Sequence, residues 1–583
     1  NRLWIMITQN KVLIEKQLEA SISHLKLGQL YGSSKNLAIS EILDKDMFSV
    51  IVCPNSDSAQ SVFRDIQFFS KNNVHVELLP DLEMLPYDLN PPIKGLKASR
   101  SETFYKLANG DIGVLVLNAQ NLLWRIPEPS FFIDNAKRLK KSDVITIHEI
   151  QDIFSRSGFE RKNVVSFPGE YSVRGSIIDF YSTINGLPVR LDLLDETIDS
   201  MRYFDIETQL TIEPIDGCNI VPVDFFSKKE EQIEFFKMNF RNSHEGNHME
   251  WPLYQSIDED YEANGTYNYL PFFHKQTVSL LNYFETDTRF FCIGDIEESL
   301  NAYHDLINSR FSDFQIEGQP MISPDNLFFN PLEQFERIMS KNAVAIYEEK
   351  LISRGPMERN QDTLPISFLF QNNEQKELVN ILEFKSKNNL SKILISIPSL
   401  LKRNSLIEQI KGEDLEYEII NDWFEFLESK HELLISHGDI DQGFILKNFH
   451  LGVLTEKDVF GFKRNNKERK QLRDPESIIQ NLKDLRRGSL IVHRDYGIGV
   501  YDGLNKMKID GIDYEFIKIM YANDDLLQLP VTQLDKISRY IGDASDEKTL
   551  SKLGTDQWSK ISNKAKEKAH DVAAELLELY AFR

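Results

Sequence analysis

The stretch LYGSSKNLAISEIL, from Leu30 to Leu43, has the layout of a phosphate-binding loop, in which a short polar turn with one lysine leads into an apolar run patterned like a helix. A Walker A loop, G-x-x-x-x-G-K-[ST], wraps phosphate with backbone N–H groups, reaches it with the lysine and binds Mg²⁺ through the hydroxyl. When the loop is aligned on its lysine, the fixed positions fall on Gln29, Ser34, Lys35 and Asn36. Both glycines and the hydroxyl are replaced, so we expect a degenerate loop that binds no cofactor and gives Lys35 no role.

The rest of the chain offers no second set of reactive residues. Cys53, Cys218 and Cys292 stand far apart without a C-x-x-C pair, which indicates structural thiols in a reducing cytoplasm. His493 and Asp495 have no nucleophile or ligand set beside them, which favours a role in stabilising a turn. No Walker B or DExH-type box follows the loop. We therefore predict no catalytic residue, no metal site and no ATPase activity in this chain.

Composition indicates an acidic, multidomain globular protein. With 583 residues the chain is too long for one hydrophobic core, and its 41% hydrophobic and 27% charged residues are ordinary for globular proteins. No apolar stretch approaches the ~20 residues that span a bilayer, and the first residues lack the apolar segment of a secretory signal. The net charge of −23 has the wrong sign for a protein that coats DNA. We expect a cytoplasmic monomer without membrane contact, in which any nucleic-acid contact is local.

The elements that position these residues follow from hydrophobic patterning. Up to about Ile150, β-branched runs such as FSVIVCP alternate with helix-like segments, which predicts α/β structure. Strand patterns separated by turn signals, from Val164 to Val221, predict a compact antiparallel insert. A further α/β unit with the strands KILISIP, HELLISHG and LGVLTEKDVFG is followed by a basic connector, a small β-barrel and a final helix. The connector, from Phe462 to Gly488, fits either a solvated linker helix or a stripe that binds phosphate.

Several long motifs resemble one protein family. The segment from Glu77 to Pro127 contains LPYD, the pair Ser99–Arg100 and LLWR in that order. It resembles the first domain of the nucleotide-excision-repair helicase UvrB and, more closely, the UvrB-homology module of the bacterial transcription-repair coupling factors (Mfd). PGEYSVRGSIIDFYS and PVRLDLLDETIDSMRYFDIETQLTIE resemble the inserted second domain of that module. The last part of the chain resembles the family's RNA-polymerase-interacting domain and relay helix in the segments LRRGSLIVHRDYGIGVYDGL, YEFIKIMYANDDLLQLPVTQLDKISRY and DVAAELLELYAFR. In the middle of the chain the resemblance depends on YNYLPFF and VLTEKDVFG.

The resemblance implies a multidomain α/β protein. It would comprise a degenerate P-loop, RecA-like UvrB-type module with an antiparallel β-rich insert, a further small α/β domain, a small SH3/Tudor-like (CarD-like) β-barrel and a C-terminal helix. The expected domains are UvrB-like domain 1a at 1–150, the inserted UvrA-binding domain 2 at 151–224, UvrB-like domain 1b at 225–342, α/β domain 3 at 343–462, a basic linker at 463–487, the RNA-polymerase-interacting barrel at 488–545 and the relay helix at 546–583. The relay helix would lead to a motor beyond Arg583.

The segment VRLDLLD contains the first candidate docking residues. Strand alternation places Val189, Leu191 and Leu193 on one face, which suits a core. The other face carries arginine beside an apolar residue, a composition suited to a protein interface. The resemblance implies that UvrA is contacted by Arg174, Arg190, Leu194 and Arg202. The alternative is that the arginines only pair with Asp179, Asp192 or Asp195, for about 0–1 kcal/mol each.

The segment GIDYEFIKIMYANDD contains the second set. Alternation places Ile512, Tyr514 and Phe516 on one face and Ile517, Ile519 and Tyr521 on the other. A small barrel buries only one face, and addition of a strand to a sheet edge is a natural docking mode. The resemblance implies binding to the RNA polymerase β subunit through Phe516, Ile517, Lys518 and Ile519.

The implied function is that of the non-motor part of a coupling factor. The barrel would hold stalled RNA polymerase and the insert would recruit UvrA, while ATP, Mg²⁺ and double-stranded DNA would be handled by a motor absent from this chain. Two alternatives remain open. A UvrB-like ATP-dependent damage-loading helicase needs an intact phosphate loop, and a CarD-type transcription regulator leaves the UvrB-like module unexplained.

Overall fold

The computed structural model describes residues 24–461 and 490–552, with gaps at 45–46, 71–73, 90, 93, 183–185, 207, 227–229, 245, 258–264, 317–320, 353–357, 367–376, 494–495, 510–511, 523–524, 531–536 and 540–549. The chain divides after Gly461 into two compact units, each of which is described by itself. The predicted basic linker, and the predicted relay helix apart from residues 550–552, lie outside the described residues. None of the described helices is both long enough and apolar enough to cross a bilayer.

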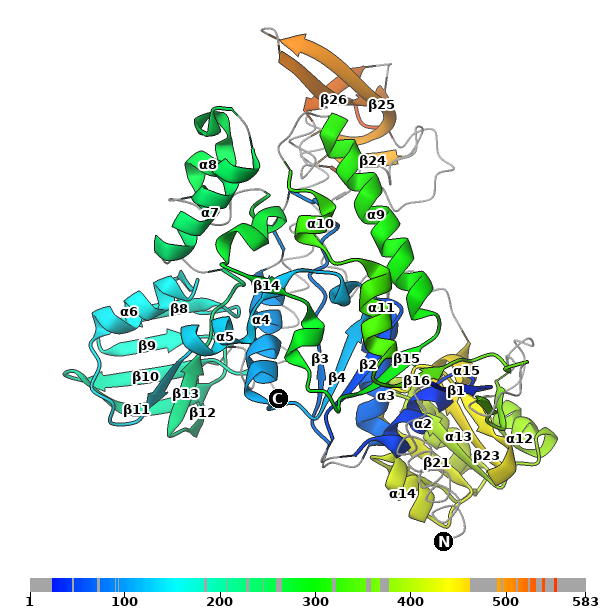
Figure 1. Ribbon diagram of the computed structural model, residues 1–583. Coiled ribbons are helices and arrows are strands. Elements are labelled where there is room, and N and C mark those ends of the chain that lie inside the picture. The colour runs from blue at the N-terminus through cyan, green and yellow to red at the C-terminus, as the bar shows by residue number, and fades with distance from the viewer. Residues whose placement is uncertain are drawn as a thin grey trace. The chain divides into compact units, whose positions relative to one another are not determined.

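A seven-stranded parallel sheet forms the centre of the first unit (Figure 1). Its strands, in the order β17-β1-β16-β15-β2-β4-β3, include the short buried β-branched runs typical of parallel sheets. They are β1 (His24–Gly28), β2 (Ser49–Cys53), β3 (Val76–Leu78), β4 (Val114–Asn118), β15 (Arg289–Ile293), β16 (Asn342–Ile346) and β17 (Glu358–Asn360). The strands β16 and β17 belong to this sheet although they follow the predicted boundary at 342, because β1 pairs with both of them.

Helices and short turns connect and cover these strands. Asn55 caps the helix α3 by accepting a hydrogen bond from the Ser58 N–H at 2.9 Å. The elements before the insert are α2 (Ser34–Ile42), α3 (Ser56–Phe69), α4 (Lys94–Asn109), η1 (Ala119–Leu122), β5 (Ile126–Pro127) and α5 (Pro129–Asn135). Those after it are α7 (Glu230–Ser243), η3 (His248–Glu250), α8 (Pro252–Ser256), η4 (Thr266–Phe273), β14 (Thr277–Val278), η5 (Leu280–Tyr283), α9 (Ile296–Ile316), α10 (Pro324–Leu327) and α11 (Pro331–Met339).

The insert forms a second, six-stranded sheet, which confirms the predicted compact β-rich texture. Its strands, in the order β12-β11-β10-β9-β8-β7, are antiparallel except for the short parallel pair β7 and β8. They are β7 (Glu160–Arg161), β8 (Glu170–Arg174), β9 (Ile177–Phe180), β10 (Val189–Leu194), β11 (Thr197–Phe204) and β12 (Thr211–Pro214). The helix α6 (Ile147–Arg156) buries Ile150 and Phe154 in the core of the insert. The strand β6 (Lys137–Lys140), which precedes the six-stranded sheet in the sequence, pairs with β13 (Gly217–Ile220), which follows it.

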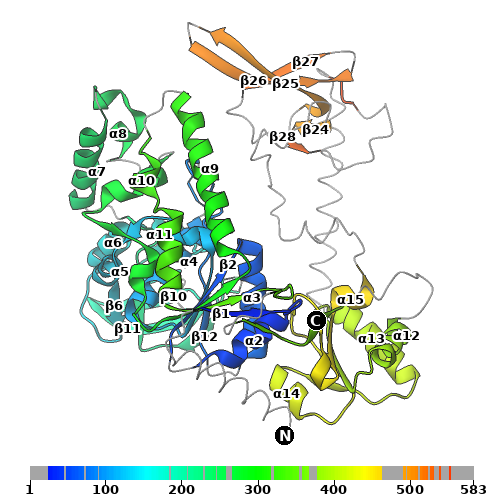
Figure 2. The same ribbon diagram turned by 45° about the vertical axis from the view of Figure 1, so that its right-hand side comes forward.

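The last part of the first unit is the predicted further α/β domain, here called the third domain. Its mixed sheet has the order β18-β22-β23-β19-β21-β20 and contains β18 (Thr363–Pro365), β19 (Lys392–Ser396), β20 (Glu418–Ile420), β21 (Leu433–Ser436), β22 (Phe444–Leu446) and β23 (Leu451–Thr455). Its helices are α12 (Glu377–Lys387), α13 (Leu400–Gly412), α14 (Trp423–Glu428), η6 (Lys447–Phe449) and α15 (Glu456–Phe460). Figure 2 shows α12 and α13 side by side, and both pack against Ile393 and Ile395 of β19.

The described residues of the second unit form a five-stranded antiparallel sheet. Its order is β27-β26-β25-β24-β28, with β24 (Leu490–His493), β25 (Gly497–Ile509), β26 (Ile512–Met520), β27 (Leu526–Pro530) and β28 (Ile537–Arg539). A small core of Ile491, Tyr501, Ile517, Ile519, Tyr521 and Leu529 fills it. Gly499 lets β25 lie close to this core, because a Cβ there would come within 2.5 Å of Ile519 Cγ2.

Candidate functional site

Three places in the structure contain the predicted functional residues. The first is the outer face of the insert sheet, here called the arginine face, which contains Arg174, Asp179, Arg190, Asp192, Leu194 and Arg202. The second is the loop corner, residues 29–36, between β1 and α2. The third is the strand β26 of the second unit.

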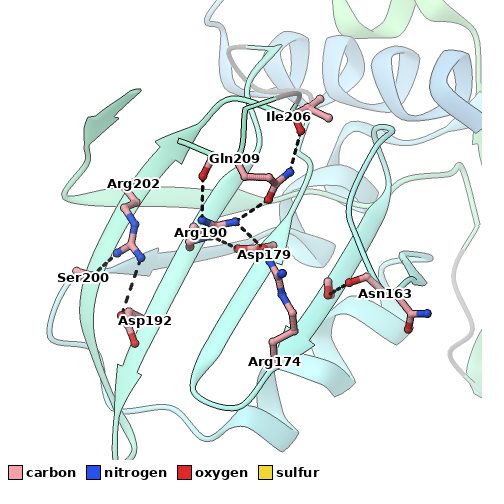
Figure 3. Close-up of polar contacts among 10 residues, drawn as sticks. Asn163, Arg174, Asp179, Arg190, Asp192, Ser200, Arg202, Ile206 and Gln209 are labelled. Atoms are coloured by element: carbon pink, nitrogen blue, oxygen red, sulfur yellow. Dashed lines mark hydrogen bonds and ion pairs between the residues drawn. The ribbon is translucent and has the colours of Figure 1, made fainter. Parts of the chain in front are cut away.

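The arginine face and the insert core lie on opposite sides of β10. Val189, Leu191 and Leu193 are buried in the core, whereas Leu194 is 67% exposed and Arg190 is partly exposed on the other side. This confirms the predicted division of the strand into two faces. Strand pairing sets Arg190 opposite Asp179 of β9 and Arg202 of β11, so the sheet brings the three predicted arginines together (Figure 3).

Asp179 is the centre of this face. Its side chain is 2% exposed, and its carboxylate accepts hydrogen bonds from Arg190 Nε at 2.6 Å and Nη2 at 3.0 Å. Arg174 Nη2 donates a further bond to it at 2.5 Å. A buried carboxylate is tolerated when paired charges and hydrogen bonds satisfy it, so Asp179 fixes the position of two arginines.

Arg190 contacts Asp179, Phe204 and Gln209 of its own domain. Its guanidinium lies 4.3 Å from the centre of the Phe204 ring and donates to the Gln209 backbone oxygen at 3.3 Å and side-chain oxygen at 2.9 Å. Only 14% of the side chain is exposed, whereas the side chain of Arg174 is 50% exposed. The pairing alternative thus describes the geometry of Arg190, and most of the surface open to a partner comes from Arg174 and Leu194.

Arg202 completes the arginine face beside β10. Its Nη1 donates to Ser200 Oγ at 2.8 Å, and its Nη2 lies 4.0 Å from an oxygen of Asp192 (Figure 3). Both groups are partly exposed, so this pair contributes about 0–1 kcal/mol to folding. The geometry leaves the guanidinium of Arg202 positioned but loosely held.

Several exposed apolar residues of the insert were missed from the sequence. Phe167, Leu210 and Ile212 are 66%, 68% and 49% exposed, although large apolar side chains usually lie inside. Leu210 follows Gln209, which binds Arg190, and all four residues of the edge strand β12 are exposed. Alternation in the sequence does not reveal an edge strand with no buried face, because the exposure depends on the neighbouring strands.

The loop corner has the predicted form of a loop that leads into a helix, and protein groups engage all four Walker A positions. Lys35 forms an ion pair with Glu348, and Asn36 Nδ2 donates to Asp65 at 2.7 Å. The remaining two positions are satisfied as well, since Ser34 Oγ donates to the Tyr31 carbonyl at 2.7 Å and Gln29 Nε2 lies 3.5 Å from the Thr363 carbonyl.

The third domain lies directly on this loop. Thr363 Oγ1 accepts the Tyr31 N–H at 3.0 Å and donates to the Gln29 carbonyl at 2.7 Å. On the other side, the Ser33 N–H donates to the Gln442 carbonyl at 3.2 Å, and the Gln442 N–H donates to Ser33 Oγ at 3.0 Å. The loop corner is therefore bonded to two segments that follow it by more than 300 residues.

Asp65 of α3 accepts hydrogen bonds from both sides of this contact, from Asn36 and from the Asp441 backbone. Its titration predicts how the stability of the fold depends on pH. Burial raises its pKa from 3.8 to about 6, and Asp441 raises it further while hydrogen bonds from Ser33, Asn36 and the Asp441 backbone oppose the shift. The raised pKa means that the folded chain holds this proton more tightly. The contribution of this proton to the free energy of unfolding is therefore complete below the unfolded pKa of Asp65 and is lost as the pH rises through about 6.

We expect Asp65→Asn to remove this pH dependence. Between pH 5 and pH 7, wild type should lose about 1 kcal/mol of unfolding free energy that the variant does not lose. Chemical denaturation of both chains at the two pH values measures the difference. An equal pH dependence in the two chains would contradict the assignment to Asp65.

The strand β26 requires a correction of the predicted polymerase-binding residues. Ile517 and Ile519 are 0% exposed and form the core, while Phe516 and Lys518 are partly exposed on the other face. The side chains of the two isoleucines therefore cannot form a docking surface in the folded domain. In addition, β26 is paired with β25 on one side and β27 on the other, so edge addition would have to use an outer strand of the described sheet, β27 or β28.

The thiols and the remaining polar candidates carry no reactive arrangement among the described residues. Burial raises the pKa of Cys53, Cys218 and Cys292 to about 12, which keeps these thiols protonated and weakly nucleophilic. His493 is buried beside the Tyr496 ring, and Asp495 lies outside the described residues. The described part of the chain contains no group of three or more side chains suited to a metal ion.

Three family models match parts of the chain. The UvrB interaction domain matches residues 138–226, the MFD, D3 domain matches residues 386–459, and the CarD-like/TRCF RID domain matches residues 485–541. The first match covers the insert sheet with the arginine face, and the second covers most of the third domain. The third covers the five-stranded sheet that contains β26.

Curated relatives match nearly the whole chain. A transcription-repair-coupling factor of Haemophilus influenzae is 30% identical over 570 residues, which cover 96% of this chain and 49% of the relative. Those of Escherichia coli (29% over 562 residues; 96% and 48%) and Bacillus subtilis (24% over 592 residues; 97% and 49%) match similarly. The chain spans about half the length of the curated relatives it matches.

Proposed function

Because the chain belongs to the transcription-repair-coupling factor family, we propose that it acts as a docking scaffold that recruits UvrA through the insert and holds RNA polymerase through the five-stranded sheet. The observation that carries this proposal is the arginine face, which contains an exposed leucine and two arginines paired with Asp179, on a domain that matches the UvrB interaction domain. The proposal assigns no catalytic step to the chain. It works by recognition.

The composition of the arginine face supports a protein partner. The centres of protein interfaces are enriched in arginine and depleted of most other charged residues, and their apolar side chains fill pockets that are shielded from water. Leu194 supplies the apolar anchor, and Arg174 supplies a guanidinium that is half exposed and oriented by Asp179. A partner surface with an apolar pocket and nearby carboxylates fits this arrangement, and we assign that surface to UvrA.

We expect Leu194→Glu to weaken binding to UvrA at least ~10-fold without changing the stability of the insert, because the side chain is exposed and a carboxylate there would have to lose its water to enter an apolar pocket. Surface plasmon resonance with immobilised UvrA measures the affinity. The matched control is Leu332→Glu, an equivalent change at an exposed leucine of α11, which should leave binding unchanged. Equal affinity of both variants and wild type would refute the UvrA surface.

The second docking surface is proposed on the five-stranded sheet. Phe516 and Lys518 present a mixed aromatic and basic surface on the face opposite to the core, and Leu526 of the outer strand β27 is 45% exposed. These features suit docking to the RNA polymerase β subunit by side-chain contact together with edge pairing. The CarD-type regulator alternative shares this domain but leaves the insert and the parallel sheet without a role.

The module around the loop corner is proposed to be a degenerate P-loop, RecA-like fold without nucleotide. All four Walker A positions are bonded to protein groups, so binding ATP would require several of these bonds to break. ATP, Mg²⁺ and double-stranded DNA are assigned to the part of the longer relatives that this chain does not span. We place the protein in the cytoplasm as a monomer.

Calorimetric titration of the chain with ATP and Mg²⁺ should give no saturable heat, because the helix N-terminus at the loop corner faces protein groups instead of free phosphate. The same titration with a chain that carries an intact Walker A loop, such as UvrB, is the positive control. Tight ATP binding would overturn this part of the proposal and favour the UvrB-like helicase alternative.

A further inference from the structure

We propose that the third domain provides an internal ligand for the loop corner. Residues 438–443, here called the plug segment, would lie where a phosphate loop receives its nucleotide and make the corner a permanent joint between the parallel sheet and the third domain. This role is separate from the docking of UvrA and polymerase, and it gives a function to a domain whose sequence suggested none.

The first support is a reciprocal pair of hydrogen bonds at the start of α2. The Ser33 N–H, one of the groups that would bind phosphate, donates to the Gln442 carbonyl at 3.2 Å. The Gln442 N–H returns a bond to Ser33 Oγ at 3.0 Å. A backbone carbonyl thus takes the place of a phosphate oxygen, and it brings no negative charge that would need Mg²⁺.

The second support explains the substitution at the magnesium position. Asn36, which replaces the Walker hydroxyl, donates its Nδ2 to Asp65 Oδ2 at 2.7 Å, while the Asp441 N–H donates to Asp65 Oδ1 at 3.0 Å. Asp65 is fully buried, so its two oxygens depend on these donors. Asn36 therefore orients the acceptor that holds the plug segment.

The third support is a hydrophobic cluster shared by the two parts. Leu37 of α2 and Phe68 and Phe69 of α3 pack with residues of the third domain, and the Phe69 and Trp423 rings meet edge to face at 5.5 Å. Alternation along β19 turns Leu394 towards this cluster, whereas its neighbours face α12 and α13. A buried aromatic cluster of this kind is typical of a lasting contact.

The fourth support is the close fit of two glycines. Gly32 has φ +57°, and a Cβ there would come within 2.5 Å of the Gly443 carbonyl oxygen. A Cβ at Gly438 would come within 2.5 Å of the Phe68 ring. Backbone from the third domain therefore approaches the loop corner as closely as a bound ligand would.

Gly32→Ala tests the joint, and Gly110→Ala is the matched control. Both glycines have positive φ, +57° and +72°, so both alanines introduce backbone strain, but a Cβ at Gly110 has no heavy atom within 4 Å. We expect Gly32→Ala to raise amide hydrogen exchange at least ~10-fold in peptides that cover residues 33–37 and 438–443 of the full chain. Gly110→Ala should leave exchange in both peptides unchanged.

A charge exchange provides the second test, in case Gly32→Ala prevents folding. Arg64 Nη1 and Asp439 Oδ2 lie 2.5 Å apart across the joint, and both side chains are about half exposed, so the fold should tolerate their replacement. Arg64→Asp and Asp439→Arg should each speed exchange in the same two peptides, and the double variant should restore it. Unchanged exchange in Gly32→Ala, or no restoration in the double variant, would overturn the joint whether or not UvrA and polymerase bind.

Discussion

Ile517→Arg is expected to unfold the five-stranded sheet and to abolish polymerase binding indirectly. The side chain is 0% exposed and packs in a core of few residues with Ile519 and Tyr521. An unpaired guanidinium in such a core costs several kcal/mol, which is comparable with the whole stability of a small domain. In the variant chain, unfolding of this sheet would be seen as a loss of the β-sheet circular dichroism signal or as complete hydrogen exchange of the β26 amides.

Phe516→Ala and Lys518→Glu separate docking from folding on the same strand. Both side chains are partly exposed on the opposite face, so each variant should keep the protected amides of β26 while its affinity for the polymerase β subunit falls. The contrast with Ile517→Arg is the informative observation. A folded Ile517→Arg chain that fails to bind polymerase would contradict the burial of this residue and restore it to the docking surface.

Arg190→Ala is expected to destabilise the insert by about 3 kcal/mol, the lower part of the range for removal of one partner from a buried ion pair. The change leaves the Asp179 carboxylate, which is 2% exposed, with only Arg174 as its charged partner. It also removes the contact with the Phe204 ring and both bonds to Gln209. The loss therefore combines an unsatisfied charge with lost packing.

Urea denaturation, monitored by a signal from the insert, measures this loss of unfolding free energy, and Arg174→Ala is the control. Arg174 is half exposed and makes a single bond to Asp179, so its removal should cost less than about 1 kcal/mol. Equal stability of Arg190→Ala and wild type would contradict the central position of Asp179. Because Arg190 stabilises the fold, loss of UvrA binding in Arg190→Ala alone would not identify a contact residue, whereas loss in Leu194→Glu would.

The local sequence pattern was sufficient to predict which residues are buried in one of the two docking strands. In β10 the buried positions alternate with charged ones, so the sequence alone separates core from surface, and the structure places Leu191 in the core and Leu194 outside as predicted. In β26 both faces carry apolar residues beside charged ones. Periodicity cannot choose which of these two faces is buried, and the packing of Ile517 in the core of the sheet decides it.

Contacts between distant parts of the chain could not be predicted. The degenerate loop was recognised from Gln29, Ser34 and Asn36, because the chemistry of phosphate binding fixes the residue type at each position. The partner of that loop was not recognised. Ser33 and Gln442 are 409 positions apart, and nothing in either local sequence specifies their pairing.

The docking proposal is tested most directly by asking whether the chain bridges its two assigned partners. RNA polymerase is immobilised, the chain and UvrA are added, and the amounts of both proteins retained are measured. We expect UvrA to be retained only when the chain is present, Leu194→Glu to remain on polymerase without UvrA, and Lys518→Glu to reduce retention of both. Equal retention of UvrA with wild type and Leu194→Glu, or no retention of the chain by polymerase, would contradict the docking proposal.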